Sequence, residues 1–170
     1  MRAAALERRG LAWIDWRAVE HDTAIPPAGE AVTGARREAF VRELAQIRDL
    51  LVNGEADRLR VPDRTVNTRL ATSVFASTGE ALRPGLREKL FAAYWTRGED
   101  LTDPELLEPF GADHPDDQTA RRWRAEWLAL AKPIVPTLVL PDGYVSRGLG
   151  ALTRLAHLAD EAWRIIEGRP

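Results

Sequence analysis

The sequence predicts an α/β chain in which short strands near both ends flank a long helical segment. Residues 11–19 combine aromatic and β-branched residues with partly alternating polarity, which is typical of a strand. Residues 137–140 form a brief apolar run between turn-forming residues, which indicates a second, buried strand. Residues 34–130 carry several amphipathic patterns with helical spacing, which predict helices between the two strands.

The N-terminal elements follow one another without a long connection. Residues 2–9 read as the last turns of a helix, and Gly10 stands where a glycine ends a helix. The strand predicted at 11–19 comes next, followed by a loop that contains Pro26 and Pro27. A helix that opens the chain and leads directly into a strand is typical of the second half of a βαβ unit whose first strand is absent.

The central helices are marked by apolar stripes and by capping residues. Phe40, Leu44 and Ile47 share one face of the first, and Asn67 is placed to cap the second. Pro104 stands at the first helical position of a short helix that Thr102 or Asp103 would cap. The expected helices cover residues 34–54, Asn67 to just before Gly79, 85–97, 104–107 and 116–131.

The stretch from Lys132 to Ser146 organises the C-terminal part. The apolar strand at 137–140 leads into the turn-forming sequence at 141–143 and a second strand, and a final helix is expected over 150–167. Pro136 stands at the head of the first of these strands. Because proline cannot donate to a sheet ladder, it marks an edge, a bulge or a cis bond. The hairpin and helix that follow favour a cis Val135–Pro136 bond, which is also what the family resemblance given below implies.

Composition excludes several classes of protein. The chain has 170 residues, a size typical of one domain or of a small core with an insertion, and a net charge of −2. Its 22 arginines and 2 lysines are interspersed with 26 acidic residues, so no basic field for nucleic acid is expected. No apolar run approaches the roughly 20 residues of a membrane span, and the polar start lacks a signal peptide's apolar stretch. We expect a cytoplasmic protein without a membrane or nucleic-acid partner.

The chain contains no cysteine. It therefore has no disulfide, no thiolate nucleophile and no cysteine metal ligand of its own. The three histidines, His21, His114 and His157, lie far apart in the sequence and show no metal-ligand spacing. Neither a catalytic residue nor a metal site is predicted.

Three segments carry a resemblance to a known family: residues 66–71, residues 90–107, and residues 134–139 with the turn and helix that follow. Together they resemble the DsbA-like branch of the thioredoxin superfamily, which includes FrnE-type oxidoreductases, 2-hydroxychromene-2-carboxylate isomerases and kappa-class glutathione transferases. The resemblance implies an incomplete thioredoxin-like fold with a large inserted α-helical domain. Residues 1–30 and 132–170 would form the core, without its first strand, and residues 31–131 the insertion.

The family's first strand leads to a Cys-x-x-Cys motif or a serine-containing variant, and this chain lacks both the strand and the motif. Three interpretations remain open. Translation begins at an internal methionine and the motif lies upstream; or the chain is a family member that binds a ligand or partner without thiol chemistry; or it is a structural protein whose strands pair with a second chain. The edges of Trp13–Val19 and Thr137–Leu140 would then pair with each other or with a second molecule, as in a homodimer.

The family implies thiol–disulfide oxidoreduction, or isomerase or transferase chemistry with a low-molecular-weight thiol of the glutathione or mycothiol type. A substrate or thiol would lie beside the proline strand, and an anion would be favoured at the N-terminus of the final helix. Other aromatic and polar residues have plainer interpretations, since tryptophans at strand or helix spacing are usually core and the His21–Asp22 pair fits a surface loop. The implied site residues are Val135, Pro136, Thr137, Ser146, Arg147, Gly148 and Asn67.

Overall fold

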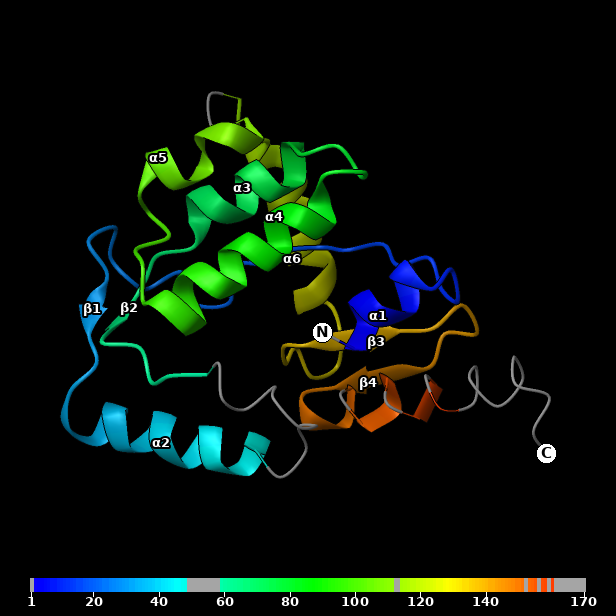
Figure 1. The fold of residues 1–170 in the computed structure, drawn as a ribbon, viewed down its shortest axis with the longest axis horizontal. Coiled ribbons are helices and arrows are strands. Elements are labelled where there is room, and N and C mark those ends of the chain that lie inside the picture. The colour runs from blue at the N-terminus through cyan, green and yellow to red at the C-terminus, as the bar shows by residue number, and fades with distance from the viewer. Residues whose placement is uncertain are drawn as a thin grey trace. The chain divides into compact units, whose positions relative to one another are not determined.

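The computed structural model describes residues 2–48, 59–111, 114–151, 153–155, 157–158 and 160. These residues form a mixed α/β structure with two short antiparallel sheets (Figure 1). One compact unit is formed by Met1–Trp16 with Leu130–Pro170 and a second by Arg17–Ala129. The mixed α/β class is thus as predicted. The units part at 16/17 and 129/130, and the sequence-based boundaries were 30/31 and 131/132.

The first unit opens with helix α1 (Arg2–Arg8). As predicted, Gly10 ends it: the N–H of Gly10 donates to the carbonyl of Glu7 (2.9 Å), and the N–H of Leu11 to the carbonyl of Leu6 (3.0 Å). This pair of hydrogen bonds is a Schellman motif, which satisfies carbonyls at the helix end. The motif requires a left-handed residue, and Gly10 has φ of +67°.

The prediction of a strand at residues 11–19 is wrong, because none of these residues is in a strand. A strand forms only when a neighbouring strand completes its ladder, and none of the strands among the described residues pairs with this segment. A side-chain contact is made instead: the indole Nε1 of Trp16 donates to Oε1 of Glu7 (2.7 Å). Trp13 is 77% exposed, so it is not the core residue that was expected.

The rest of this segment belongs to the second unit, where it contacts helix α6 (Asp117–Leu128). Arg17 forms an ion pair with Glu126. The Nε of Arg124 donates to the carbonyl of Glu20 (2.9 Å). Side-chain contacts thus hold residues 17–20, which belong to none of the described strands.

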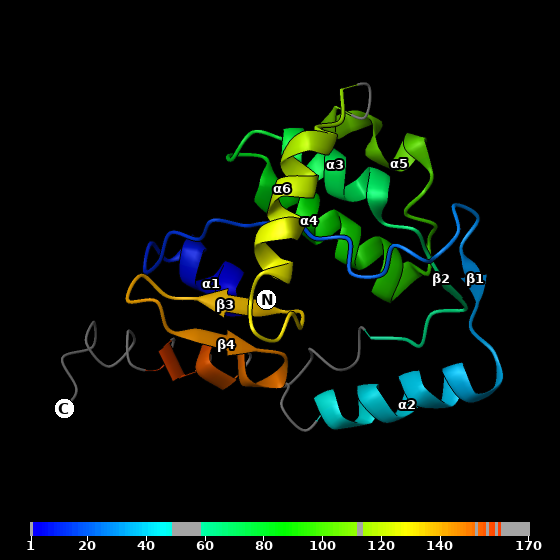
Figure 2. The same ribbon diagram turned by 180° about the vertical axis from the view of Figure 1, so that it is seen from behind.

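The C-terminal part of the first unit contains strands β3 (Thr137–Val139) and β4 (Val145–Arg147). They pair with each other, so the direct pairing of Thr137–Leu140 with Trp13–Val19, one of two routes predicted, is not present among the described residues. Helical residues at 149–151, 153–155, 157–158 and 160 follow β4 and lie alongside it in both face views (Figures 1 and 2). The remainder of the predicted final helix, up to residue 167, lies outside the described residues.

The second unit begins with the short strands β1 (Glu30–Ala31) and β2 (Arg64–Thr65), which pair antiparallel. Helix α2 (Gly34–Arg48) lies between them in sequence and matches the predicted helix. The last part of that prediction, residues 49–54, lies outside the described residues.

Four helices of the second unit follow the predicted order. They are α3 (Arg69–Ser77), α4 (Arg83–Phe91), which continues as the π-helical turn η2 (Ala92–Arg97), α5 (Pro104–Leu107), which continues as the 3₁₀ turn η3 (Glu108–Phe110), and α6. As predicted, the Asp103 side chain accepts from the N–H of Glu105 (2.9 Å) and so caps α5. Capping side chains therefore set the starts of α5 and α6 locally, and α3 and α4 begin without one.

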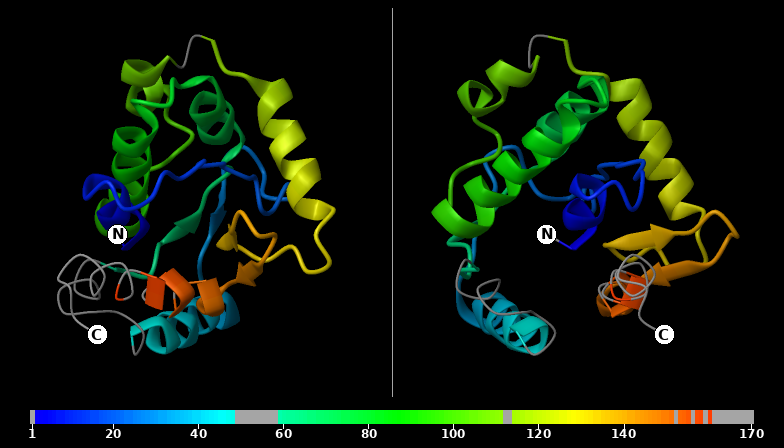
Figure 3. Two further views of the ribbon diagram at one scale, coloured as in Figure 1. Left: turned by 90° about the vertical axis from the view of Figure 1, so that its right-hand side faces the viewer. Right: turned by 45° about the vertical axis from the view of Figure 1, so that its right-hand side comes forward.

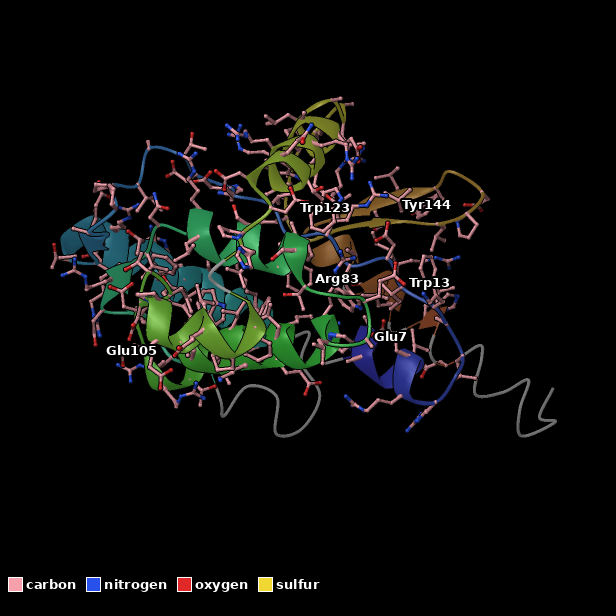
Figure 4. All side chains as sticks on the ribbon, turned by 90° about the horizontal axis from the view of Figure 1, so that it is seen from above. Glu7, Trp13, Arg83, Glu105, Trp123 and Tyr144 are labelled. Atoms are coloured by element: carbon pink, nitrogen blue, oxygen red, sulfur yellow. The ribbon has the colours of Figure 1, made fainter. Side chains whose placement is uncertain are left out.

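The core of the second unit lies where α3 packs against α4 and α6 (Figure 2). Val74 and Leu86 are fully buried there, and Phe75 lies edge-on to Trp123 with ring centroids 6.5 Å apart. The guanidinium of Arg83 lies over both rings, 5.2 Å from the centroid of Trp123 (Figure 4). Trp123 and Trp127 are buried, as expected of core tryptophans.

Arg83 also satisfies the C-terminal carbonyls of α3. Its Nε donates to the carbonyl of Thr78 (3.0 Å), and its Nη2 to the carbonyl of Ala76 (3.2 Å). A helix end leaves such carbonyls without intrahelical donors, and a cation there also complements the helix dipole. Arg83 therefore joins α4 to the end of α3.

We expect Arg83→Ala to lower the free energy of unfolding by about 1–3 kcal/mol, because it removes two charge-assisted hydrogen bonds and the ring contacts. Chemical denaturation of the purified chain measures the change. Arg42→Ala is the control, since Arg42 is exposed and lies 4.0 Å from Glu38, and its effect should stay within about 0.5 kcal/mol. Equal losses in the two variants would contradict the role of Arg83.

The start of α6 is tied to α3 through Asp117. The Oγ of Ser73, which is buried, donates to Oδ1 of Asp117 (2.6 Å), and Arg69 lies 3.4 Å from Oδ2. The N–H of Asp116 donates to the carbonyl of Ser73 (3.0 Å). The hydrogen bond from Ser73, followed by that from Arg69, holds the pKa of Asp117 below its ordinary value. The pKa of Asp116 is lowered by the backbone N–H of Thr119, which its side chain caps.

The stability of the second unit should therefore fall on acidification. A carboxylate whose pKa is lower in the folded than in the unfolded chain contributes its full stabilisation above the unfolded value, about 3.9 for aspartate. That contribution is lost as the pH falls through the folded pKa. Thermal melts between about pH 6 and pH 2.5 should show the loss. Asp117→Asn should be less stable than the native chain at neutral pH and should show a shallower fall below about pH 4. An unchanged acid profile in this variant would refute the assignment.

Candidate functional site

The candidate site is built on β3, β4 and the turn between them, all in the first unit (Figure 3). The strands pair antiparallel with Leu138 opposite Ser146. The turn predicted at residues 141–143 is present, since the N–H of Gly143 donates to the carbonyl of Leu140 (2.9 Å). Gly143 has φ of +84°, a conformation that glycine adopts without a steric penalty. The hairpin thus follows from turn residues that are local in the sequence.

Pro136 is held at the head of β3 by contacts on both sides. The Val135–Pro136 bond is cis, as predicted. The carbonyl of Pro136 accepts a hydrogen bond from the N–H of Gly148 (2.8 Å). The Oγ1 of Thr137 donates to the carbonyl of Ile134 (2.6 Å). These contacts fix the backbone that leads into the strand and bring Gly148 next to Val135, Pro136 and Thr137.

The backbone of β3 presents alternate residues to opposite edges. Hydrogen bonds join Pro136 to Gly148 and the N–H of Leu140 to the carbonyl of Tyr144 (2.9 Å), so residues of even number face β4. The N–H and carbonyl groups of Thr137 and Val139 consequently point to the other edge. β4 is the one strand that pairs with β3 among the described residues. We call this second edge the outer edge of β3.

The residues after β4 lead into the helical segment. Ser146 is buried, and a Cβ added to Gly150 would lie 3.3 Å from its Oγ, so the hydroxyl packs against the first helical turn. The carbonyl of Gly148 accepts from the N–H of Ala151 (3.1 Å). The Nε of Arg147 is buried and has no hydrogen-bond partner within the described part of the chain. Among the site residues that the resemblance implies, Arg147 is the one with a cationic side chain.

Asn67, the remaining residue that the resemblance implies, belongs to the second unit. Its Oδ1 accepts from the N–H of Arg69 (3.0 Å), the first residue of α3, and its Nδ2 donates to the carbonyl of Ile25 (2.7 Å). Thr68 occupies the cap position itself, so Asn67 acts one residue earlier than predicted. Both ends of its amide are engaged by backbone groups, which accounts for an asparagine here without a ligand.

Sequence reasoning missed two side chains of the first unit. The guanidinium of Arg154 lies over the ring of Tyr144, 5.8 Å from the centroid. The Nε of Arg154 is buried and, like that of Arg147, has no hydrogen-bond partner among the described residues. Tyr144, which Figure 4 labels, is 52% exposed. The sequence signals available for these two side chains were a tyrosine directly after the turn and an arginine about one turn into the final helix.

A shallow hollow of about 400 Å³ in the second unit gathers acidic residues around Lys89. Three of their carboxylates already have partners: Glu99 pairs with Arg97, Oδ1 of Asp100 accepts from both the N–H and the Oγ1 of Thr102, and Asp103 caps α5. No group of three or more metal-ligating side chains occurs in the described ranges. The hollow therefore shows no built site. It is lined by Lys89, Glu99, Asp100, Asp103, Glu105 and Leu106.

The His21–Asp22 pair is divided between separate contacts. The ring of His21 lies against that of Trp127, with centroids 5.7 Å apart and an interplanar angle of 53°. Oδ1 of Asp22 accepts from the N–H of Ala24 (2.9 Å), a local turn contact. The surface-loop interpretation of this pair accounts for both contacts.

Searches of protein-family models, curated proteins and solved structures found no match to this chain. In the described residues, none of the helices has the length and apolar character needed to cross a membrane. The family stated above therefore remains a proposal, and the hairpin geometry is the basis on which function can be argued.

Proposed function

We propose that this chain is a DsbA-like member of the thioredoxin superfamily and that its hairpin site binds an extended peptide. The observation that carries the proposal is the outer edge of β3, which begins at Pro136 and presents the backbone groups of Thr137 and Val139. The three sequence segments that resemble the family support it, as does the cis bond at the position the family implies. A cytoplasmic location is part of the same proposal.

An extended peptide would bind by adding a strand to this edge. Each outward-facing residue offers one donor and one acceptor, which is the pattern that strand addition uses. The side chains beside the edge are apolar and accessible: Val135 is 41% exposed and Val139 is 57% exposed. Backbone hydrogen bonds would provide affinity, and these side chains would favour β-branched or other apolar residues in the peptide.

The chain would bind rather than catalyse. Thiol–disulfide exchange needs a thiolate, and the sequence has no cysteine. In the proposal, Val135, Pro136 and Thr137 hold the peptide backbone, while any redox step belongs to residues outside these 170 positions.

Arg147 and Arg154 favour a second candidate function, the binding of a low-molecular-weight thiol of the glutathione or mycothiol type. Their Nε donors are buried and lack partners among the described residues, and buried donors are costly when unpaired. A carboxylate of such a thiol would satisfy them. This reading accords with the isomerase and transferase members of the family.

The peptide proposal is tested by changing the outer edge alone. Val139→Pro removes an outward N–H and leaves the bonds of Leu138 to β4 intact, whereas Val139→Thr keeps the N–H and the β-branch. The probe is a labelled hexapeptide of alternating Val and Thr, with a control peptide N-methylated at every second residue. We expect Val139→Pro to weaken binding about tenfold, close to the loss of one hydrogen bond. Val139→Thr should bind like the native chain.

Thermal melts show whether both variants keep the hairpin. Binding of the N-methylated peptide as tightly as the plain one would contradict strand addition. Unchanged binding by a folded Val139→Pro variant would contradict it as well. Competition by glutathione that disappears in Arg147→Gln but is kept in Val139→Pro would favour the second candidate.

A further inference from the structure

We propose that the peptide bound at the outer edge of β3 is acidic, with a glutamate opposite Thr137 whose carboxylate binds the guanidinium of Arg147. This assignment rests on the proposed function, because it specifies which peptide adds to that edge. Arg147 then sets the specificity, while the backbone groups of Thr137 and Val139 supply the strand contacts.

Thr137 and Arg147 are neighbours on one face of the hairpin. The register places them directly opposite each other. Because the residues of even number in β3 make the hydrogen bonds to β4, Thr137 and Arg147 form a non-hydrogen-bonded pair, in which the side chains lie closest. Leu138 and Ser146 belong to the other face, where Ser146 is buried. Arg147 therefore shares a face with both outward residues of β3, Thr137 and Val139.

A peptide strand on the outer edge extends this pair to a row of three side chains. The peptide residue opposite Thr137 exchanges backbone hydrogen bonds with it, so its side chain stands on the same face. Its Cα lies two strand spacings from that of Arg147, roughly 10 Å. An extended glutamate and an extended arginine side chain together span this distance. Thr137 between them is short, and its Oγ1 already donates to the carbonyl of Ile134 (2.6 Å).

Arg147 has no carboxylate partner within the described part of the chain. Its Nε is buried without a hydrogen-bond partner, and the side chain forms no ion pair there. By contrast, Arg36 and Arg97 pair with Glu30 and Glu99. A buried donor without a partner is costly, and a carboxylate matches the planar fork of donors of a guanidinium. An acidic side chain of a bound peptide would supply the missing partner.

The surroundings of Arg147 favour an acidic peptide with an apolar neighbour. In the first unit, lysines and arginines outnumber aspartates and glutamates, although the whole chain has a net charge of −2. An antiparallel peptide, the slightly more stable arrangement, places the residue two positions before the glutamate opposite Val139, which is 57% exposed. A β-branched residue suits that position. The peptide pattern that fits the edge is therefore Val-x-Glu.

The test compares two labelled hexapeptides, Val-Thr-Val-Thr-Glu-Thr and the same peptide with glutamine in place of glutamate, by fluorescence anisotropy against the whole chain. The native chain should bind the glutamate peptide about tenfold more tightly, as expected for a charge-assisted contact. In Arg147→Gln this preference should fall below about twofold. Arg147→Lys should keep part of it, because an ammonium retains the charge without the fork.

Lys132→Gln is the matched control for general electrostatic attraction, since it removes one positive charge from an exposed position of the same unit. Its preference for the glutamate peptide should equal that of the native chain. Val139→Pro should weaken both peptides, because both need the outer edge. Thermal melts show whether each variant is folded, and the comparison of the two peptides on the native chain needs no variant.

Equal binding of the two peptides by the native chain overturns the inference. So does a glutamate preference that persists in a folded Arg147→Gln variant or is lost equally in Lys132→Gln. Binding of the glutamate peptide that Val139→Pro leaves unchanged would also overturn it, because the carboxylate would then bind without the edge.

The proposed function is tested separately, with the glutamine peptide. If this peptide needs the outer edge and binds as tightly as the glutamate peptide, the inference is overturned and the proposed function stands. If neither peptide needs the edge, both are overturned.

Discussion

The hydrogen bond from the N–H of Gly148 to the carbonyl of Pro136 fixes which backbone groups of β3 face β4. Proline has only a carbonyl to offer, so it must accept from β4 or lose its place in the ladder. Because Pro136 faces β4, Leu138 does too, and Thr137 and Val139 face away. The hydrogen bond accepted by Pro136 thus decides which backbone groups of β3 are open to a further strand.

Elements whose signals are local could be predicted from the sequence. Gly10 ends α1, Asp103 starts α5, and Gly143 completes the hairpin turn, because each acts through backbone groups within a few residues. The strand predicted at 11–19 failed for the opposite reason. Its composition suits a strand, but a ladder needs a partner, and side chains such as Arg17 fix this segment instead. Strand propensity depends on neighbours that a local pattern does not contain.

The candidate site likewise combines contacts that are local in the sequence with contacts that are not. Val135, Pro136 and Thr137 are neighbours in sequence, and the contact with Gly148 follows from a short hairpin. The position of Arg154 over the ring of Tyr144 depends on how the final helix packs on the hairpin, which no spacing rule predicts. Asn67 could be recognised as a residue that starts a helix, but its bond to Ile25 joins positions 42 apart. Long-range contacts of this kind decide whether a polar residue is structural or open to a ligand.

Amide hydrogen exchange at low protein concentration tests the open outer edge most directly. We expect slow exchange for Leu138 and Gly148, whose N–H groups face the partner strand of the hairpin, and fast exchange for Thr137 and Val139. The two fast amides should become protected when an extended peptide adds to this edge. Equal protection of Thr137, Leu138 and Val139 at low concentration would contradict the claim that β3 presents a free edge.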